Sequence, residues 1–255
     1  MKELFKIDNQ VAVVVGGAGG IGEAIALGLG QFGAKIVLAS RNMEALKNVA
    51  KKITAQTGAE TLPVQVDVTD EESMEKLVKS VTNHFGTVDI LVNAMGVNIK
   101  RDALDYPMED WDRIFDVNVK GTMIACKHFG KVMKNRGHGK IINLSSGPGM
   151  RGSSGGNTAY RGSKGAVELI TKALAVELAP YKIRVNAIGP IFFITPGTIH
   201  IREYPELAEK YSSVIPLGKL AVPEDVIGSV VFFASEASSF VTGQVLYVDG
   251  GLTAS

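Results

Sequence analysis

Cysteine is nearly absent from this chain, and its scarcity narrows the possible chemistry. The 255 residues include one cysteine, Cys126, which excludes an intrachain disulfide and a cysteine-rich metal site. Cys126 lies in an apolar segment with a helical pattern. In such a segment a buried structural thiol is a more common role than a reactive one.

Long apolar runs and an excess of charge are also absent. No apolar stretch reaches the roughly 18 residues of a membrane span, and Met1–Asp8 has no signal-peptide pattern. Lys plus Arg number 27 and Asp plus Glu number 26, so the net charge is +1. We therefore expect a cytoplasmic protein that binds neither nucleic acid nor an anionic membrane.

The overall composition is that of an ordinary globular protein. Hydrophobic residues make up 45% and charged residues 21%, which allows a substantial core. The length suits one large α/β domain or two small ones. Since no linker or short-period repeat interrupts the pattern, we expect a single domain over residues 1–255.

Short apolar runs alternate with amphipathic stretches along the chain. Continuous apolar runs are typical of parallel strands that are covered on both faces, so the alternation predicts an α/β Rossmann fold, a doubly wound seven-stranded parallel sheet. The expected strands are Val11–Val15, Ile36–Ala39, Thr61–Val66, Ile90–Val92, Lys140–Leu144, Arg184–Ile188 and Val245–Val248. The expected helices are Ile21–Phe32, Glu44–Gln56, Glu71–Phe85, Trp111–Met133, Tyr160–Ala179 and Asp225–Ser235.

The longest stretch without periodicity runs from residue 190 to about residue 216, with a helical piece near Glu206–Ser212. A loop of this length in a compact domain is usually functional. We interpret it as a lid over the substrate, with packing at an oligomer interface as the alternative.

A glycine-rich turn, Gly16-Gly17-Ala18-Gly19-Gly20-Ile21-Gly22, joins the first expected strand to the first expected helix. Glycines there allow a tight turn and a close approach of the backbone to a pyrophosphate, which the helix N-terminus also attracts. The pattern favours a dinucleotide site; a merely tight turn is the alternative.

The residues that follow the second and third strands bear on the choice of cofactor. Ser40 and Arg41 stand where an acidic residue would bind the ribose hydroxyls of NAD, and they offer a hydroxyl and a guanidinium to a 2′-phosphate. We therefore predict NADP(H) in preference to NAD(H), although Arg41 would also suit a solvated position. Asp67, followed by Val68, is placed to accept from the adenine amino group or to cap the next helix.

Tyr160 and Lys164 lie four residues apart, which places a phenol and an ammonium one helical turn apart. A free tyrosine has a pKa of about 10, and a nearby positive charge favours the phenolate. The pair is a candidate proton-transfer device, but by itself the same spacing is also that of an ordinary half-exposed helix face.

Taken together, these motifs resemble the short-chain dehydrogenase/reductase family over essentially the whole chain. The positions that carry the resemblance are Gly16, Gly20 and Gly22, Asn93–Gly96, Asn118, Ile142–Ser146, Tyr160, Lys164, Val185–Pro190, Thr195 and Val241–Gly251. Within the family, the stretch Asn93–Arg101 is similar to that of gluconate 5-dehydrogenases.

The resemblance implies a catalytic set of four residues. Tyr160 would be the general acid or base, Lys164 would bind the nicotinamide ribose and lower the pKa of Tyr160, and Ser146 would hydrogen-bond the substrate oxygen. Asn118 would hold a water in a proton path. We choose Ser146 over Ser145 from its family-like separation from Tyr160 and because the two-residue period points Ser145 elsewhere.

The resemblance also implies the cofactor contacts. Asn93 and Gly96 would shape the floor of the groove, and Ile188 and Thr195 would contact the nicotinamide carboxamide. The full expected set is Gly16, Gly20, Ile21, Gly22, Ser40, Arg41, Asp67, Val68, Asn93, Gly96, Tyr160, Lys164, Pro190 and Thr195. No metal is expected.

Three residues depart from the family pattern. Val15 replaces the usual threonine before the glycine turn, and Met95 replaces a small alanine beside the groove. Ile191 follows Pro190 where the family usually has glycine, and isoleucine rarely adopts left-handed dihedrals. We expect the loop after Pro190 to depart from the family path.

The expected reaction is hydride transfer between NADP(H) and a secondary alcohol or ketone, with a sugar acid or polyol as the substrate. The basic residues near the expected site entrance that would bind a carboxylate are Lys100, Arg101, Arg151 and Arg161. A 3-oxoacyl-(acyl-carrier-protein) reductase, a general carbonyl reductase and a non-catalytic NADP-binding regulatory module are the alternatives. The resemblance implies a homotetramer built through Trp111–Met133, Tyr160–Ala179 and the last strand.

Overall fold

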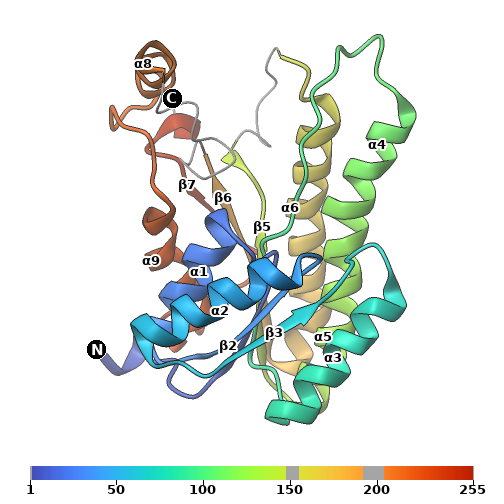
Figure 1. The fold of residues 1–255 in the computed structure, drawn as a ribbon, viewed down its shortest axis with the longest axis vertical. Coiled ribbons are helices and arrows are strands. Elements are labelled where there is room, and N and C mark those ends of the chain that lie inside the picture. The colour runs from blue at the N-terminus through green and yellow to red at the C-terminus, as the bar shows by residue number, and fades with distance from the viewer. Residues whose placement is uncertain (1, 148–154, 192–203, 255) are drawn as a thin grey trace.

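A computed structural model describes residues 2–147, 155–191 and 204–254 of the chain (Figure 1). Its seven strands form one parallel sheet in the order β3-β2-β1-β4-β5-β6-β7. The strands are β1 (Val11–Val15), β2 (Lys35–Ser40), β3 (Thr61–Gln65), β4 (Ile90–Asn93), β5 (Gly139–Leu144), β6 (Ile183–Pro190) and β7 (Val245–Val248). The predicted doubly wound Rossmann fold is confirmed, and β1 and β7 have the predicted bounds.

Helices cover both faces of this sheet. They are α1 (Gly20–Gln31), α2 (Met43–Thr57), α3 (Glu71–Phe85), α4 (Met108–Phe115), α5 (Gly121–Arg136), α6 (Thr158–Leu178), α8 (Pro205–Ser212) and α9 (Ile227–Ala234). The short 3-10 helices are η1 (Lys2–Phe5), η4 (Ala179–Tyr181), η5 (Pro223–Val226), η6 (Glu236–Ser238) and η7 (Leu252–Ala254). None of the helices in the described ranges combines the length and the apolarity needed to cross a membrane.

Two hydrophobic cores lie on opposite faces of the sheet because the strands are apolar on both sides. On one face, α1, α2 and α9 contribute side chains such as Leu29, Ile53 and Phe233 (Figure 1). On the other face, α3, α5 and α6 contribute side chains such as Leu77 and Phe129. Because the strands are all parallel, their carboxyl ends lie at one edge of the sheet, where ligands of such sheets bind.

The expected single helix over Trp111–Met133 is interrupted. A π-helical segment, η2 (Asp116–Lys120), separates α4 from α5. Such a segment accommodates one extra residue per turn and is often found at functional sites. Residue periodicity alone did not reveal it, because the apolar pattern continues through it.

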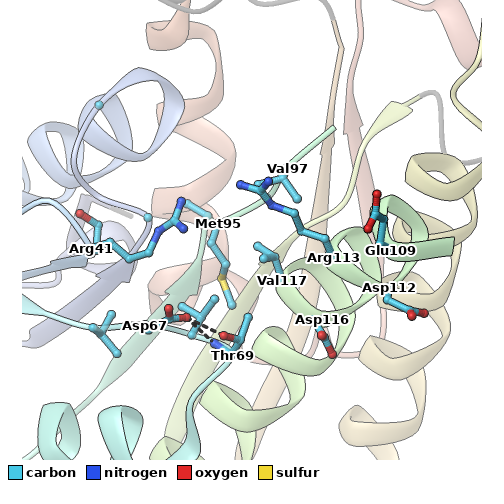
Figure 2. Close-up of a pocket in the computed structure, with 17 residues that line it drawn as sticks. Arg41, Asp67, Thr69, Met95, Val97, Glu109, Asp112, Arg113, Asp116 and Val117 are labelled. Carbon is cyan, nitrogen blue, oxygen red and sulfur yellow. Dashed lines mark hydrogen bonds between the residues drawn. The ribbon is translucent and has the colours of Figure 1, made fainter. Parts of the chain in front are cut away.

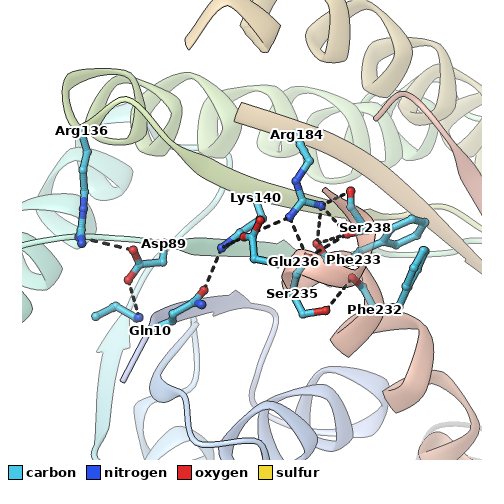
Figure 3. Close-up of polar contacts among 11 residues, drawn as sticks. Gln10, Asp89, Arg136, Lys140, Arg184, Phe232, Phe233, Ser235, Glu236 and Ser238 are labelled. Atoms are coloured by element: carbon cyan, nitrogen blue, oxygen red, sulfur yellow. Dashed lines mark hydrogen bonds and ion pairs between the residues drawn. The ribbon is translucent and has the colours of Figure 1, made fainter. Parts of the chain in front are cut away.

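A polar cluster of Arg184, Lys140, Ser235, Glu236 and Ser238 lies at the amino ends of β5 and β6 (Figure 3). Arg184 of β6 donates to the carbonyls of Phe233, Ser235 and Ser238 at 3.3, 2.9 and 2.8 Å. These carbonyls lie at the end of α9 and in the following η6 helix, and each also accepts a hydrogen bond from Ser238 or Val241. Buried Lys140 of β5 pairs with Glu236 at 3.2 Å, so this cluster ties α9 to the sheet.

Candidate active site

A cavity of about 730 Å³ opens at the carboxyl ends of the strands (Figure 2). Its lining residues come from the first four strand ends and from α4 and η2. They are Gly16, Gly19, Ser40, Arg41, Val66, Asp67, Val68, Thr69, Ala94, Met95, Gly96, Val97, Glu109, Asp112, Arg113, Asp116 and Val117. The volume is within the range of small-molecule and cofactor sites.

The glycine turn forms one wall, and side chains would not fit there. Gly16 has φ +91°, and a Cβ on it would lie 2.7 Å from the Met95 amide nitrogen. A Cβ on Gly22 would lie 2.2 Å from the Gly16 carbonyl oxygen, so α1 begins in direct contact with the turn. The free N–H groups at the start of α1 therefore face a cradle without side chains, which fits the pyrophosphate of a dinucleotide.

The adenosine end of the cavity carries the residues expected for cofactor choice. Arg41 is exposed, and Figure 2 shows it extending from β2 toward the cavity. Asp67 accepts hydrogen bonds from the Thr69 amide at 2.9 Å and the Thr69 hydroxyl at 2.7 Å. These bonds, and the charge of Arg41, hold the pKa of Asp67 below its usual value.

The alternative role of Asp67 as a helix cap belongs to another residue. Asp70 is the N-cap of α3, and its carboxylate accepts from the Glu72 amide at 3.0 Å. Asp67 is thus left as an ionised turn residue on the wall of the cavity.

Asn93 and Gly96, which were expected to share the groove floor, lie in different surroundings. Gly96 lines the cavity, and a Cβ on it would lie 3.3 Å from Lys164 Nζ. The Asn93 side chain is buried and donates to Asn143 Oδ1 at 2.9 Å and to Cys126 Sγ at 3.3 Å. These contacts give Asn93 a place in the core between β4 and β5 rather than on the cavity wall.

The interrupted helix presents Asn118 to the site. Its side chain is fully buried; Oδ1 accepts from the Val97 amide at 2.8 Å, and Nδ2 donates to the Val97 carbonyl at 3.0 Å. Nδ2 also donates to Ser163 Oγ at 2.9 Å. Asn118 therefore links the turn after β4 to α6. Its contact on α6 is Ser163, the residue before Lys164.

Tyr160, Lys164 and Ser146 come together at the start of α6. Lys164 is buried, and its ammonium donates to the Leu144 carbonyl at 2.8 Å and lies 5.8 Å from the centre of the Tyr160 ring. The Ser146 hydroxyl lies beside the Tyr160 phenol, close enough to act on the pKa of Tyr160. Ser145 instead contacts Glu168, at 2.6 Å, so of the two serines Ser146 is the one that lies beside Tyr160.

The pKa values differ from the expectation that Lys164 lowers that of Tyr160. Burial raises the pKa of Tyr160, and the Ser146 hydrogen bond and the charge of Arg161 only partly oppose this. Burial also lowers the pKa of Lys164 to about 8, because a charged amine loses its hydration. Burial thus shifts the pKa of each group in the direction that favours its neutral form.

The strand end at Pro190 leads into a buried Ile191. Among the described residues other than glycine, only Asn9 and Lys182 have positive φ, so Ile191 does not adopt the left-handed backbone that the family glycine would permit. Thr195, and the lid residues from 192 to 203, lie outside the described residues.

The four candidate carboxylate-binding residues lie in different surroundings. Arg101 is paired with Asp110 at 2.8 Å, which leaves less of its charge for a ligand. Lys100 is exposed. Arg161 is half-buried beside Tyr160, and Arg151 lies outside the described residues.

One wall of the cavity was not predicted. Figure 2 shows Arg113 reaching toward the cavity from α4, opposite Arg41. Glu109, Asp112 and Asp116 line the same wall. Their spacing of three or four residues places them on one helix face, which is the signal that could have identified them.

Comparison with known proteins decides the family. A family model described as enoyl-(acyl carrier protein) reductase matches residues 16–253. The NAD-dependent glycerol dehydrogenase of Listeria innocua is 37% identical over 98% of this chain and 96% of its own length. The 3-oxoacyl-(acyl-carrier-protein) reductase of Thermotoga maritima is 39% identical, over 97% of this chain and 99% of its own.

The chain belongs to the short-chain dehydrogenase/reductase family. Among solved structures it resembles a gluconate 5-dehydrogenase from Burkholderia cenocepacia in complex with NADP and tartrate, with a TM-score of 0.93 and 30% identity, covering 99% of this chain and 98% of that one. Gluconate 5-dehydrogenases are thus among its relatives, and other members are as similar. The chain is accordingly an NAD(P)-dependent oxidoreductase that acts on CH–OH groups.

Proposed function

We propose that this enzyme transfers a hydride between NADP(H) and a secondary alcohol or ketone of the sugar-acid or polyol class. The observation that carries the proposal is the meeting of Ser146 and Tyr160 with Lys164, whose ammonium lies next to Gly96 on the wall of a cofactor-sized cavity. A bound nicotinamide dinucleotide supplies or accepts the hydride. The glycine turn, Ser40, Arg41 and Asp67 would hold it.

The chain's own residues account for the proton. The Tyr160 phenol donates a proton to the carbonyl oxygen in reduction and removes it in oxidation. The Ser146 hydroxyl hydrogen-bonds the same oxygen as negative charge develops there. Lys164 supplies positive charge beside the phenol, and Asn118 fixes the turn at Val97 and the start of α6 against each other.

NADP is proposed over NAD on the chemistry of the β2 end. Ser40 and Arg41 stand there, and a guanidinium is a good partner for a 2′-phosphate. The Burkholderia relative binds NADP, whereas the Listeria relative is named as NAD-dependent.

The sugar-acid class is supported by the relative named for gluconate, and the polyol class by those named for galactitol and glycerol. Arg161, beside Tyr160, and the exposed Lys100 have the positive charge that suits a carboxylate. A 3-oxoacyl thioester is the second candidate, favoured by the 39% identity to the Thermotoga reductase.

We also propose that residues 1–255 form one catalytic domain, with residues 190–216 as its lid, and that four chains assemble. Leu169 and Val176 of α6 are 67% and 76% exposed, on a helix expected to pack against a partner. The cytoplasmic location stays a prediction.

The test is turnover of a panel of sugar acids, polyols and acetoacetyl thioesters, followed through NADPH absorbance. Tyr160→Phe is expected to lower kcat by about 10²-fold or more, the usual size of general acid–base catalysis, with the cofactor Kd within about twofold. Tyr181→Phe, outside the site, is the matched control. Full activity in Tyr160→Phe would refute the catalytic assignment; cofactor binding without turnover of any substrate would favour the regulatory module.

A further inference from the structure

Glu168 is a buried carboxylate that the proposed reaction does not use. It lies on α6, one turn after Lys164, and is 7% exposed. Its Oε1 accepts from Ser145 Oγ at 2.6 Å, and its Oε2 accepts from the Tyr247 hydroxyl at 2.9 Å. A buried carboxylate is costly unless it is hydrogen-bonded, and hydroxyl bonds to a charged oxygen are strong.

The first of these bonds reaches the residue next to Ser146. Ser145 follows β5, where its amide donates to the Ile188 carbonyl at 2.8 Å. Its hydroxyl lies 2.6 Å from Glu168 Oε1 and 3.3 Å from the Lys164 carbonyl. Since successive side chains of an extended chain point in opposite directions, fixing Ser145 also fixes the direction of Ser146.

The second bond extends to the edge of the sheet. Tyr247 lies on β7, and β6 separates β7 from β5 (Figure 1). Gly189 of β6 is in register with Tyr247, and a Cβ on Gly189 would lie 2.4 Å from the Tyr247 ring. The absence of a side chain at Gly189 therefore lets the Tyr247 ring lie across β6 and reach Glu168.

We propose that Glu168 is a positioning residue for the catalytic serine, held by Tyr247 and acting through Ser145. The inference rests on the proposed function, since it concerns how Ser146 meets Tyr160. Glu168 links α6, the end of β5 and the edge strand β7 at one carboxylate, so the orientation of Ser146 depends on β7 as well as on its own strand.

The test compares Glu168→Ala and Glu168→Gln with Glu177→Ala, an exposed glutamate on the same helix. Glu168→Ala is expected to lower kcat by about 10- to 100-fold, less than the roughly 10²–10³-fold seen when such a donor is deleted outright. The cofactor Kd should stay within about twofold. Glu168→Gln should recover most of the loss because its carbonyl accepts one of the two hydroxyls, and Tyr247→Phe should show a smaller decrease than Glu168→Ala.

Crystal structures of the wild type and these variants supply a readout that is independent of turnover. In Glu168→Ala the Ser146 hydroxyl is expected to leave hydrogen-bond distance of the Tyr160 phenol, and in Glu177→Ala it should stay. An unmoved Ser146 would overturn the proposal, as would a kcat loss that Glu168→Gln shares in full. If Tyr160→Phe keeps its activity, the proposed function fails, while the position of Ser146 still decides the role of Glu168.

Discussion

At the residue scale, the site is built from groups that are unfavourable to bury. Lys164, Asn118 and Glu168 are all less than a tenth exposed. Each has hydrogen-bond partners, but the ammonium of Lys164 has lost its hydration, as its lowered pKa shows. Such groups cost stability and are retained where chemistry requires them.

Lys164→Met is therefore expected to stabilise the fold while abolishing turnover. Burial lowers the pKa of Lys164 to about 8, and an unfolded lysine titrates near 10.4. Below pH 8 Lys164 is protonated in both the folded and the unfolded state. The full free-energy cost of burying its charge, about 3 kcal/mol, then lowers the stability of the fold. Between about pH 8 and 10 the unfolded state binds more protons, so wild-type stability should rise with pH.

Lys164→Met removes the cost of burying the charge and also the hydrogen bond to the Leu144 carbonyl, worth about 1 kcal/mol. The free energy of unfolding of the variant is therefore expected to exceed that of the wild type by about 1–2 kcal/mol at pH 7. Urea unfolding at pH 7 and pH 9.5 measures it. The advantage should shrink at the higher pH; a variant less stable than the wild type at pH 7 would contradict the argument.

Arg41→Ala tests the cofactor preference. A hydrogen bond to a charged group is worth about 1.5–3 kcal/mol, so the KM for NADP should rise by about tenfold or more, with the KM for NAD within about twofold. Lys51→Ala, an exposed cation on the neighbouring α2, is the control. An equal rise in KM for NADP and NAD would show that Arg41 does not bind the 2′-phosphate.

At the scale of elements, termini are stabilised by residues from distant strands. Arg184 of β6 stabilises the end of α9 and the following η6 helix by donating to three carbonyls there (Figure 3). The α2 and α3 helices, by contrast, begin with local caps, Asn42 and Asp70. Local caps belong to the sequence pattern of their own helix, whereas the contacts of Arg184 depend on residues far away in sequence.

Arg184→Met should remove the charged donor that these carbonyls share, leave them only their local hydrogen bonds, and lower the free energy of unfolding by about 2–4 kcal/mol. Its kcat should change little at 25 °C, since the cluster is at the opposite edge of the sheet. Chemical denaturation, with Lys172→Met on the exposed side of α6 as control, measures the effect. A change below about 0.5 kcal/mol would mean that water replaces Arg184 at no cost.

At the scale of the whole molecule, exposed apolar residues mark the surfaces through which assembly is proposed. Leu169 and Val176 lie on α6, and Phe240 precedes the edge strand β7. The same β7 carries Tyr247, so an assembly through this edge would also bear on the orientation of Ser146.

The double change Leu169→Glu with Val176→Glu is expected to dissociate the assembly by placing charges on its apolar contact. Analytical ultracentrifugation should find four chains of 27.1 kDa in the wild type and smaller species in the variant. Lys51→Glu, on α2, should sediment as the wild type does. A monomeric wild type would exclude the tetramer.

The sequence by itself determined what depends on neighbouring residues. Apolar runs such as Val11–Val15, the glycine turn at Gly16 and the spacing of Tyr160 from Lys164 are local, and periodicity, sterics and helical geometry fix them. The alternation of strands and helices predicted the doubly wound sheet, and the family resemblance supplied the expected site residues.

Only the tertiary structure decided which side chains meet across strands. It placed Asn93 in the core, gave Asn118 its π-helical setting, and separated Ser145 from Ser146 by their contacts with Glu168 and Tyr160. It also buried the Tyr160 phenol, which raises the pKa of that group. These outcomes depend on packing and desolvation among residues far apart in sequence, which no local pattern encodes.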